Sequence, residues 1–303
     1  MARVFANRGI YLIIHRKILV RKYLIDQAMP EMIFYFIIRL ALAALFFALF
    51  MVATQDFHIF PGLYSSKIFG YKNSPPNDVE EYVIESTEGY KATIWRVSAK
   101  ENPKPRIAIL FHGNAENLGS FLQFQYWLSS LGYTSYSVEY RGYSGRNSGW
   151  PSEQGFYDDA SAAYEFIVNK ENITAQDMIA LGSSIGSGVA AYLAQKYDIG
   201  TLVLLAPYTS LKDLVSEITL FRYLAPFLKY TFPVKEYIKN LESTCVIAAH
   251  GKRDGTIPFS HSLKLKERYS GTGIYNLIES ESAGHNDLIL LTADNIAEAI
   301  SNC

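Results

Sequence analysis

LGSSIGSG, residues 181–188, is the stretch that decides the fold. An apolar run leads into it and a helical pattern follows it, which predicts a strand, a tight turn and a helix with Ser184 at the apex. Gly182 and Gly186 lie two residues on either side of Ser184, where larger side chains would collide in so sharp a turn. The spacing is that of the G-x-S-x-G nucleophile elbow, although glycine and serine also fill ordinary strand-to-helix turns.

The rest of the chain predicts the sheet around this turn. Residues 81–86 and 90–97 alternate in the manner of a hairpin, and strand and helix patterns alternate from Arg106 onward. Continuous apolar runs such as 106–111 are typical of strands buried on both faces of a parallel sheet. Further strands are expected at 134–140, 178–181, 201–205, 246–249 and 274–278, and helices at 118–131, 151–168, 189–197 and 286–300.

Residues 210–240, called the insert below, carry no strand pattern. We expect one or two helices lying over the sheet, with Thr209 or Ser210 as the N-cap. Tyr208, Phe221 and Leu224 are candidate substrate-binding residues that could line an acyl-chain pocket. The alternative is that these side chains simply pack on the sheet.

A serine hydroxyl becomes a useful nucleophile only beside a base, and the base needs a partner that fixes its tautomer. Three histidines follow Ser184, and His285 lies in the loop AGHND between the last strand and the last helix. His285 is therefore the candidate base, whereas His250 at a strand end and His261 on a helix are expected to be structural.

The acid is expected in the loop that follows the strand 246–249. The sequence HGKRDGTIP, residues 250–258, places Asp254 there, beside glycines that permit a tight loop. Three other aspartates compete in sequence position, Asp198, Asp213 and Asp287, of which Asp287 is expected to cap the final helix.

The negative oxygen of acyl transfer needs preorganised N–H donors. We expect these to be the backbone amides of Ile185, the residue after the nucleophile, and Asn114, in the loop after the strand ending at Phe111. His112 is expected to brace that loop. Arg141 is expected to pair with Asp158 or Asp159 rather than to bind substrate.

Five sequence blocks together resemble the α/β-hydrolase superfamily: LFHGNA at 110–115, YRGYSG at 140–145, GSSIG at 182–186, HGKRD at 250–254 and GH at 284–285. The resemblance runs from about Glu81 to the C-terminus, and the residues of these motifs are similar to those of membrane-anchored α/β-hydrolase-domain-containing proteins. It implies an α/β-hydrolase fold with a mostly parallel sheet, and neither metal nor cofactor. Some members of that subgroup are thioesterases that remove palmitate from proteins.

Residues 32–53 are apolar except for Arg39, and 22 residues at about 1.5 Å each can cross a hydrocarbon core. We expect an uncleaved transmembrane anchor over 32–54. The alternatives are a signal peptide with its core at 40–53 and a buried core helix. Residues 1–31 form a basic tail, unless translation starts at Met29 or Met32.

An irregular linker is expected over 55–79, followed by the hydrolase domain over 80–303. Basic residues before the anchor place the N-terminus in the cytoplasm and the domain outside it, in the periplasm or a lumen.

Charge and cysteine content limit the partners. The net charge is −1, and because residues 1–54 hold seven basic and two acidic residues, the remainder carries −6. No basic cluster with interleaved aromatics indicates nucleic-acid binding. Two cysteines are too few for a disulfide framework or a CxxC metal site, and Cys245 is expected to be a small buried side chain.

The sequence therefore predicts a serine hydrolase of acyl esters or thioesters, with a Ser184–His285–Asp254 triad. A peptidase or amidase on the same fold, and a catalytically silent binding protein at the membrane, are the alternatives.

Overall fold

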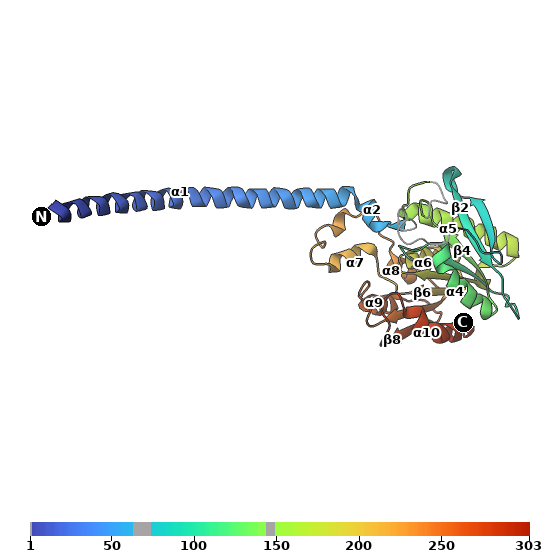
Figure 1. The fold of residues 1–303 in the computed structure, drawn as a ribbon. Coiled ribbons are helices and arrows are strands. Elements are labelled where there is room, and N and C mark those ends of the chain that lie inside the picture. The colour runs from blue at the N-terminus through green and yellow to red at the C-terminus, as the bar shows by residue number, and fades with distance from the viewer. Residues whose placement is uncertain (1, 63–73, 144–148) are drawn as a thin grey trace. The chain divides into compact units, whose positions relative to one another are not determined.

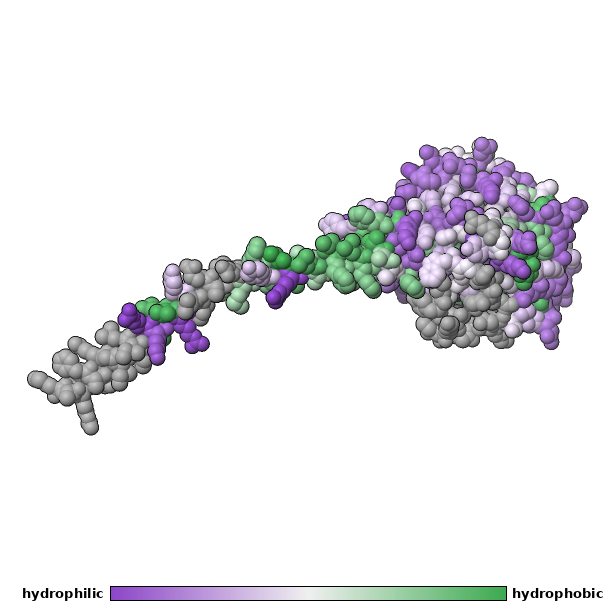
Figure 2. Space-filling model, turned by 90° about the horizontal axis from the view of Figure 1, so that it is seen from above, coloured by the Kyte–Doolittle hydropathy of each residue, from purple (hydrophilic) through white to green (hydrophobic). Residues whose placement is uncertain are grey.

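The computed structural model describes residues 2–62, 74–143 and 149–303, and the chain forms two units, residues 1–54 and 55–303. The first unit is one helix, α1 (Ala2–Ala53). Its segment Met32–Ala53 has 22 residues and a mean hydropathy of 2.6, so by length and composition it could cross a membrane. Figure 2 shows the apolar side chains gathered along the part of α1 that ends at Ala53.

The second unit is built on an eight-stranded sheet in the order β1-β2-β4-β3-β5-β6-β7-β8 (Figure 1). The pairs β1–β2 and β2–β4 are antiparallel, and every other pair is parallel. Parallel neighbours align their carboxyl ends at one edge of the sheet, where sites of α/β proteins form. The strands are β1 (Glu80–Glu85), β2 (Lys91–Val97), β3 (Ile107–Phe111), β4 (Thr134–Glu139), β5 (Met178–Ser183), β6 (Thr201–Leu205), β7 (Cys245–Gly251) and β8 (Tyr275–Ser280).

Helices cover both faces of the sheet because the central strands are apolar on both. In β3, Ile109 belongs to the core on the face of α5 and α6, and Leu110 to the core on the face of α4 and α10. The helices of the domain are α2 (Gln55–Ile59), α4 (Leu118–Ser130), α5 (Glu153–Glu171), α6 (Gly186–Tyr197), α7 (Leu211–Glu217), α8 (Val234–Lys239), α9 (Ser260–Arg268) and α10 (Leu288–Ser301), with short 3-10 turns η1 (Thr87–Gly89), η2 (Ala175–Asp177) and η3 (Ala225–Phe227).

The insert contains α7, η3 and α8 between β6 and β7. Ser210 is the N-cap of α7, and its hydroxyl accepts a hydrogen bond from the backbone N–H of Asp213 at 3.0 Å. The predicted helical insert is therefore present, with a turn region between α7 and η3.

The beginning of the domain differs from the expected irregular linker over 55–79. Residues 55–59 form α2, and Phe60 is fully buried, with its ring 4.9 Å from that of Tyr230 and 5.3 Å from that of Phe156. The prolines of this segment favour irregular structure, but the burial of one aromatic residue brings its beginning into the core. The part over 63–73 lies outside the described residues.

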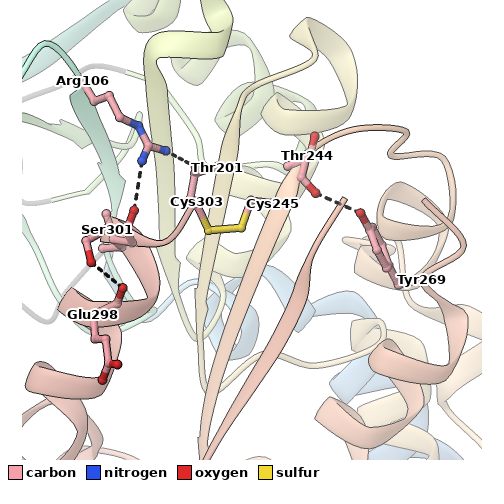
Figure 3. The surroundings of a disulfide bond; sticks show 9 residues. Arg106, Thr201, Thr244, Cys245, Tyr269, Glu298, Ser301 and Cys303 are labelled. Carbon is pink, nitrogen blue, oxygen red and sulfur yellow. Dashed lines mark hydrogen bonds between the residues drawn. A yellow bond between two sulfur atoms is a disulfide. The ribbon is translucent and has the colours of Figure 1, made fainter. Parts of the chain in front are cut away.

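The cysteines also differ from expectation, because Cys245 is disulfide-bonded to Cys303 (Figure 3). Cys245 is buried, as expected, but it opens β7 beside the end of α10. The guanidinium of Arg106 holds that end by donating to the carbonyl of Ile300 at 3.1 Å and to the hydroxyl of Thr201. The approach of the C-terminus to β7 depends on how α10 packs, which the positions of two cysteines in the sequence do not reveal.

Candidate active site

The turn after β5 has the geometry of a nucleophile elbow. Ser184 adopts a left-handed backbone conformation, with φ 52°, and its N–H donates to the carbonyl of Leu205 at 2.9 Å. A Cβ on Gly182 would lie 2.2 Å from the carbonyl oxygen of Gly186, and one on Gly186 would lie 2.2 Å from that of Phe111. Both glycines are thus required by close backbone approaches, and the strained serine is held at the apex.

Two further loops at the same edge of the sheet bring the predicted partners to Ser184. The hydroxyl of Ser184 lies 3.2 Å from Nε2 of His285, in the loop between β8 and α10. Nδ1 of His285 lies 2.7 Å from Oδ2 of Asp254, in the loop after β7. The structure therefore joins three side chains that are up to 101 residues apart in one hydrogen-bonded chain.

Asp254 is held as a carboxylate by its surroundings. Its Oδ1 accepts hydrogen bonds from the backbone N–H groups of Thr256 and Ile257, each at 2.8 Å, and its Oδ2 faces His285 and, at 3.4 Å, His250. Burial alone would raise the pKa of Asp254. The contacts with His250 and His285 and the N–H of Ile257 outweigh burial, so the pKa is held below its usual range.

His250 supports the Asp254 loop rather than competing for the role of the base. It is fully buried, its Nδ1 lies 2.7 Å from the hydroxyl of Ser262, and its Nε2 lies 2.9 Å from the carbonyl of Ile257. The structural role expected for His250 is present, and its contact with Asp254 was not predicted. The spacing of four residues in HGKRD, across a tight loop, was the signal available.

The loop after β3 is braced from several sides. The carbonyl of His112 accepts from the hydroxyl of Tyr140 at 2.9 Å, and the side-chain oxygen of Asn114 accepts from the hydroxyl of Tyr143 at 2.7 Å. The Glu116 carboxylate accepts from the N–H of Gly113. The start of α6 lies against the carbonyls of Phe111 and His112, so the beginning of this loop adjoins the elbow.

A buried pair lies beneath that loop. Nε2 of His112 lies 3.0 Å from Oε1 of Glu139, and both side chains are fully buried. Burial alone would lower the pKa of His112, but the hydrogen bond to Glu139 and its charge outweigh this and raise the pKa. His112 therefore braces the loop, and Arg141 likewise pairs with Asp159 at 2.7 Å.

The predicted substrate-binding residues are spread out. Tyr208 is buried and its hydroxyl donates to the carbonyl of Ile185 at 3.2 Å, so it supports the elbow from behind. Phe221 and Leu224 are half-buried in the turn region of the insert. No hydrogen bond or ring contact in the described part of the chain joins either of them to Ser184.

A polar hollow of about 580 Å³ lies beside the insert and does not include the triad. Four of its charged residues form two ion pairs, Asp213 with Lys235 at 2.8 Å and Glu217 with Lys264 at 2.7 Å. Within the described ranges no cluster of three or more His, Cys, Asp or Glu residues could hold a metal ion. The hollow is lined by Thr209, Asp213, Ser216, Glu217, Lys235, Lys264, Glu267 and Arg268.

Residues 102–259 match the family described as "Serine aminopeptidase, S33". The chain is similar to alpha/beta hydrolase domain-containing protein 17B of Homo sapiens, with 31% identity over 222 residues, 73% of this chain and 74% of that protein. It is also 33% identical over 190 residues to protein 17C of Mus musculus, covering 62% of this chain and 57% of the relative, less than two thirds of its length.

Solved structures share the fold. The Pyrococcus furiosus esterase Pf2001 superposes with a TM-score of 0.62 at 16% identity, covering 76% of this chain and 92% of the esterase. Mouse alpha/beta hydrolase domain-containing protein 10 superposes with a TM-score of 0.54 at 17% identity, covering 74% of this chain and 99% of that chain. At such identities the likeness concerns the fold alone.

Proposed function

The chain belongs to the α/β-hydrolase superfamily, and we propose that it is a serine hydrolase that cleaves carboxylic esters or thioesters through Ser184, His285 and Asp254. The observation that carries the proposal is the continuous hydrogen-bonded chain from the Ser184 hydroxyl through His285 to the Asp254 carboxylate. Its base-to-nucleophile distance of 3.2 Å suits proton transfer.

In the proposed reaction, Oγ of Ser184 attacks the acyl carbon while Nε2 of His285 takes the hydroxyl proton. The Asp254 carboxylate fixes the imidazole and stabilises its protonated form. The backbone N–H groups of Ile185 and Asn114 bind the oxyanion, a contribution typically worth about 10²–10³ in turnover for each donor. The leaving alcohol or thiol takes the proton from His285. Water then attacks the acyl-enzyme and gives a proton to His285, which passes it to Oγ of Ser184 as the C–Oγ bond breaks and the acid leaves.

Ser184→Ala tests the nucleophile. We expect turnover of a short aryl ester to fall by about 10⁴-fold or more, because the attacking oxygen is lost, and labelling by a fluorophosphonate probe to disappear. Ser183→Ala is the matched control, since it removes the adjacent hydroxyl of the same turn. Equal labelling of wild type and Ser184→Ala would show that another residue is the nucleophile.

A peptidase or amidase is the second candidate, because the matching family is described by an aminopeptidase activity. The same triad can act on amides, so a panel of aryl esters, thioesters and aminoacyl amides decides between the two. Hydrolysis of esters without cleavage of amides favours the ester proposal, and preferential amide cleavage overturns it.

We also propose that α1 anchors the domain to a membrane through Met32–Ala53, with the domain on the extracytoplasmic side. The length and hydropathy of that segment and the excess of basic residues before it support this placement. The Cys245–Cys303 disulfide supports it independently, because disulfides persist mainly in oxidising compartments.

A further inference from the structure

Six large apolar side chains are exposed on the insert and around α2, and together they are called the apolar patch. Tyr223 and Leu220 are the most exposed, at 79% and 70%. The rings of Phe57 and Trp150 lie 5.4 Å apart, and large apolar side chains that are exposed together often mark a binding surface. The members of the patch are Phe57, Trp150, Ile218, Leu220, Tyr223 and Phe227.

Direct contacts join the insert to α2 close to Phe227. The backbone N–H of Lys229, two residues after Phe227, donates to the side chain of Gln55 at 2.8 Å. The carboxylate of Asp56 then faces both the ammonium of Lys229 at 3.4 Å and the indole N–H of Trp150 at 3.2 Å. In Figure 1 the insert lies at the same edge of the domain as α2.

The covalent chain fixes what lies next to this patch. Gln55 follows Ala53, the last residue of the apolar segment of α1, by two positions. Two residues span at most about 7 Å, so the end of that segment cannot be far from Gln55 in any orientation of α1. A bilayer crossed by Met32–Ala53 therefore has its surface at α2, beside the apolar patch.

We propose that the apolar patch inserts into the head-group region of the bilayer that α1 crosses. The inference rests on the membrane anchor of the proposed function. The composition fits, because tyrosine and tryptophan concentrate at membrane interfaces, where their rings are buried and their polar atoms stay hydrated. Because the membrane segment ends beside α2, the surface that covers the apolar patch is lipid.

The patch also lies at the catalytic edge of the sheet. The insert starts directly after β6, whose last residue, Leu205, accepts the hydrogen bond from the N–H of Ser184. Tyr208, at the root of the insert, donates to the carbonyl of Ile185. Insertion of the patch thus presents the elbow to the bilayer surface, so the substrate class is acyl esters or thioesters whose chains are held in the same bilayer.

Depth-dependent fluorescence quenching in phosphatidylcholine vesicles tests the contact. The full chain carries Trp150→Phe to lower the background, together with either Tyr223→Trp or, as control, Leu290→Trp on α10, which is 82% exposed. Bromine atoms placed near the lipid head groups should quench the fluorescence of the tryptophan introduced by Tyr223→Trp about twofold or more. The fluorescence of the tryptophan introduced by Leu290→Trp should not change.

Alkaline carbonate extraction is run on the same vesicles, so that the anchor and the patch are judged separately. If the protein resists extraction but bromine does not quench the Tyr223→Trp emission, the anchor is present and the proposed insertion of the apolar patch is wrong. Protein released by carbonate overturns the anchor and, with it, the inference. Fluorophosphonate labelling of Ser184 reports the hydrolase proposal independently of both.

The substrate class has its own readout. Leu220→Asp combined with Tyr223→Asp should lower hydrolysis of a long-chain ester carried in vesicles by about tenfold, equivalent to about 1.4 kcal/mol. Hydrolysis of a soluble acetyl ester should stay at the wild-type rate. Equal rates of wild type and variant on the vesicle-borne ester would overturn the assignment of the substrate to the bilayer.

Discussion

Asp254 collects four polar contacts on one carboxylate, from two backbone amides and two imidazoles. Such an arrangement fixes the orientation of the carboxylate and keeps it ionised, which is what the partner of a catalytic imidazole needs. His250 and Ser262 contribute indirectly, because they hold the loop in which Asp254 lies.

Asp254→Asn is expected to lower turnover of a soluble ester by about 10⁴-fold, because an amide favours the wrong tautomer of His285.

The effect of Asp254→Asn on stability should also depend on pH. Since the pKa of Asp254 is lowered by folding, its contribution is present above the unfolded pKa and is lost as pH falls through the folded value. The contribution of the Asp254 carboxylate to the difference in unfolding free energy between wild type and variant should therefore shrink as the pH falls below about 4.

The control is Asp213→Asn, which changes a carboxylate paired with Lys235 in the insert. Its turnover should stay within a few-fold of wild type. Esterase assays with denaturation curves at several pH values provide the measurement, and comparable loss of turnover in both variants would contradict the role of Asp254.

At this scale the sequence predicted the three side chains that the structure brings together, because their order along the chain and their positions after strands are visible in it. It did not predict Tyr143 on Asn114 or His250 on Asp254, since these contacts depend on how loops meet. The placement of Phe221 and Leu224 depends in the same way on the packing of the insert.

Among the elements, β5, the elbow and α6 form a unit in which backbone segments approach one another very closely. The start of α6 approaches the end of β3 so closely that Gly186 has no room for a Cβ beside the carbonyl of Phe111. Gly182 is equally confined by the carbonyl of Gly186. The elbow is thus defined by contacts between backbones, which side-chain movement cannot relieve.

Gly182→Ala is expected to lower the unfolding free energy by about 2 kcal/mol and to reduce fluorophosphonate labelling strongly, since the new methyl group forces backbone atoms apart. Gly255→Ala is the matched control, because a Cβ there has no neighbour within 4 Å although the residue adjoins Asp254. Its effect on stability should stay within about 0.5 kcal/mol. Thermal unfolding in detergent measures both, and an unaffected Gly182→Ala would disprove the close approach.

The eight strands were predictable as elements because their apolar runs are bounded by clear turn signals. For β6 and the start of β3 the expected and observed limits agree within one residue. Short helices were harder to predict from the sequence. The helix α2 has only five residues, and its place in the domain depends on the burial of Phe60. A pattern of hydropathy does not contain that tertiary contact.

Over the whole molecule, the disulfide joins the C-terminal residue of the chain to the first residue of β7, 58 positions earlier. The loop that it closes includes β7, β8, α9 and α10, and therefore both Asp254 and His285. A cross-link over a loop of this length restricts the unfolded chain considerably.

Cys303→Ser is expected to lower the unfolding free energy by about 2–4 kcal/mol, on the chain-entropy account of disulfides. A reducing agent should lower the melting temperature of the wild type toward that of the variant and leave the variant unchanged. Ser301→Ala, next to the same C-terminus, serves as control. Free thiols at both cysteines in protein isolated from its native membrane would contradict the disulfide and weaken the extracytoplasmic placement.

The short passage from α1 to α2 limits where the proposed enzyme can act. Only Thr54 separates the end of α1 from the first residue of α2, and α2 is fastened to the insert through Gln55 and Lys229. No flexible linker therefore separates α1 from α2. An anchored domain of this kind would act in cis, on molecules that diffuse laterally in its own membrane, and a substrate on a facing membrane would be beyond its reach.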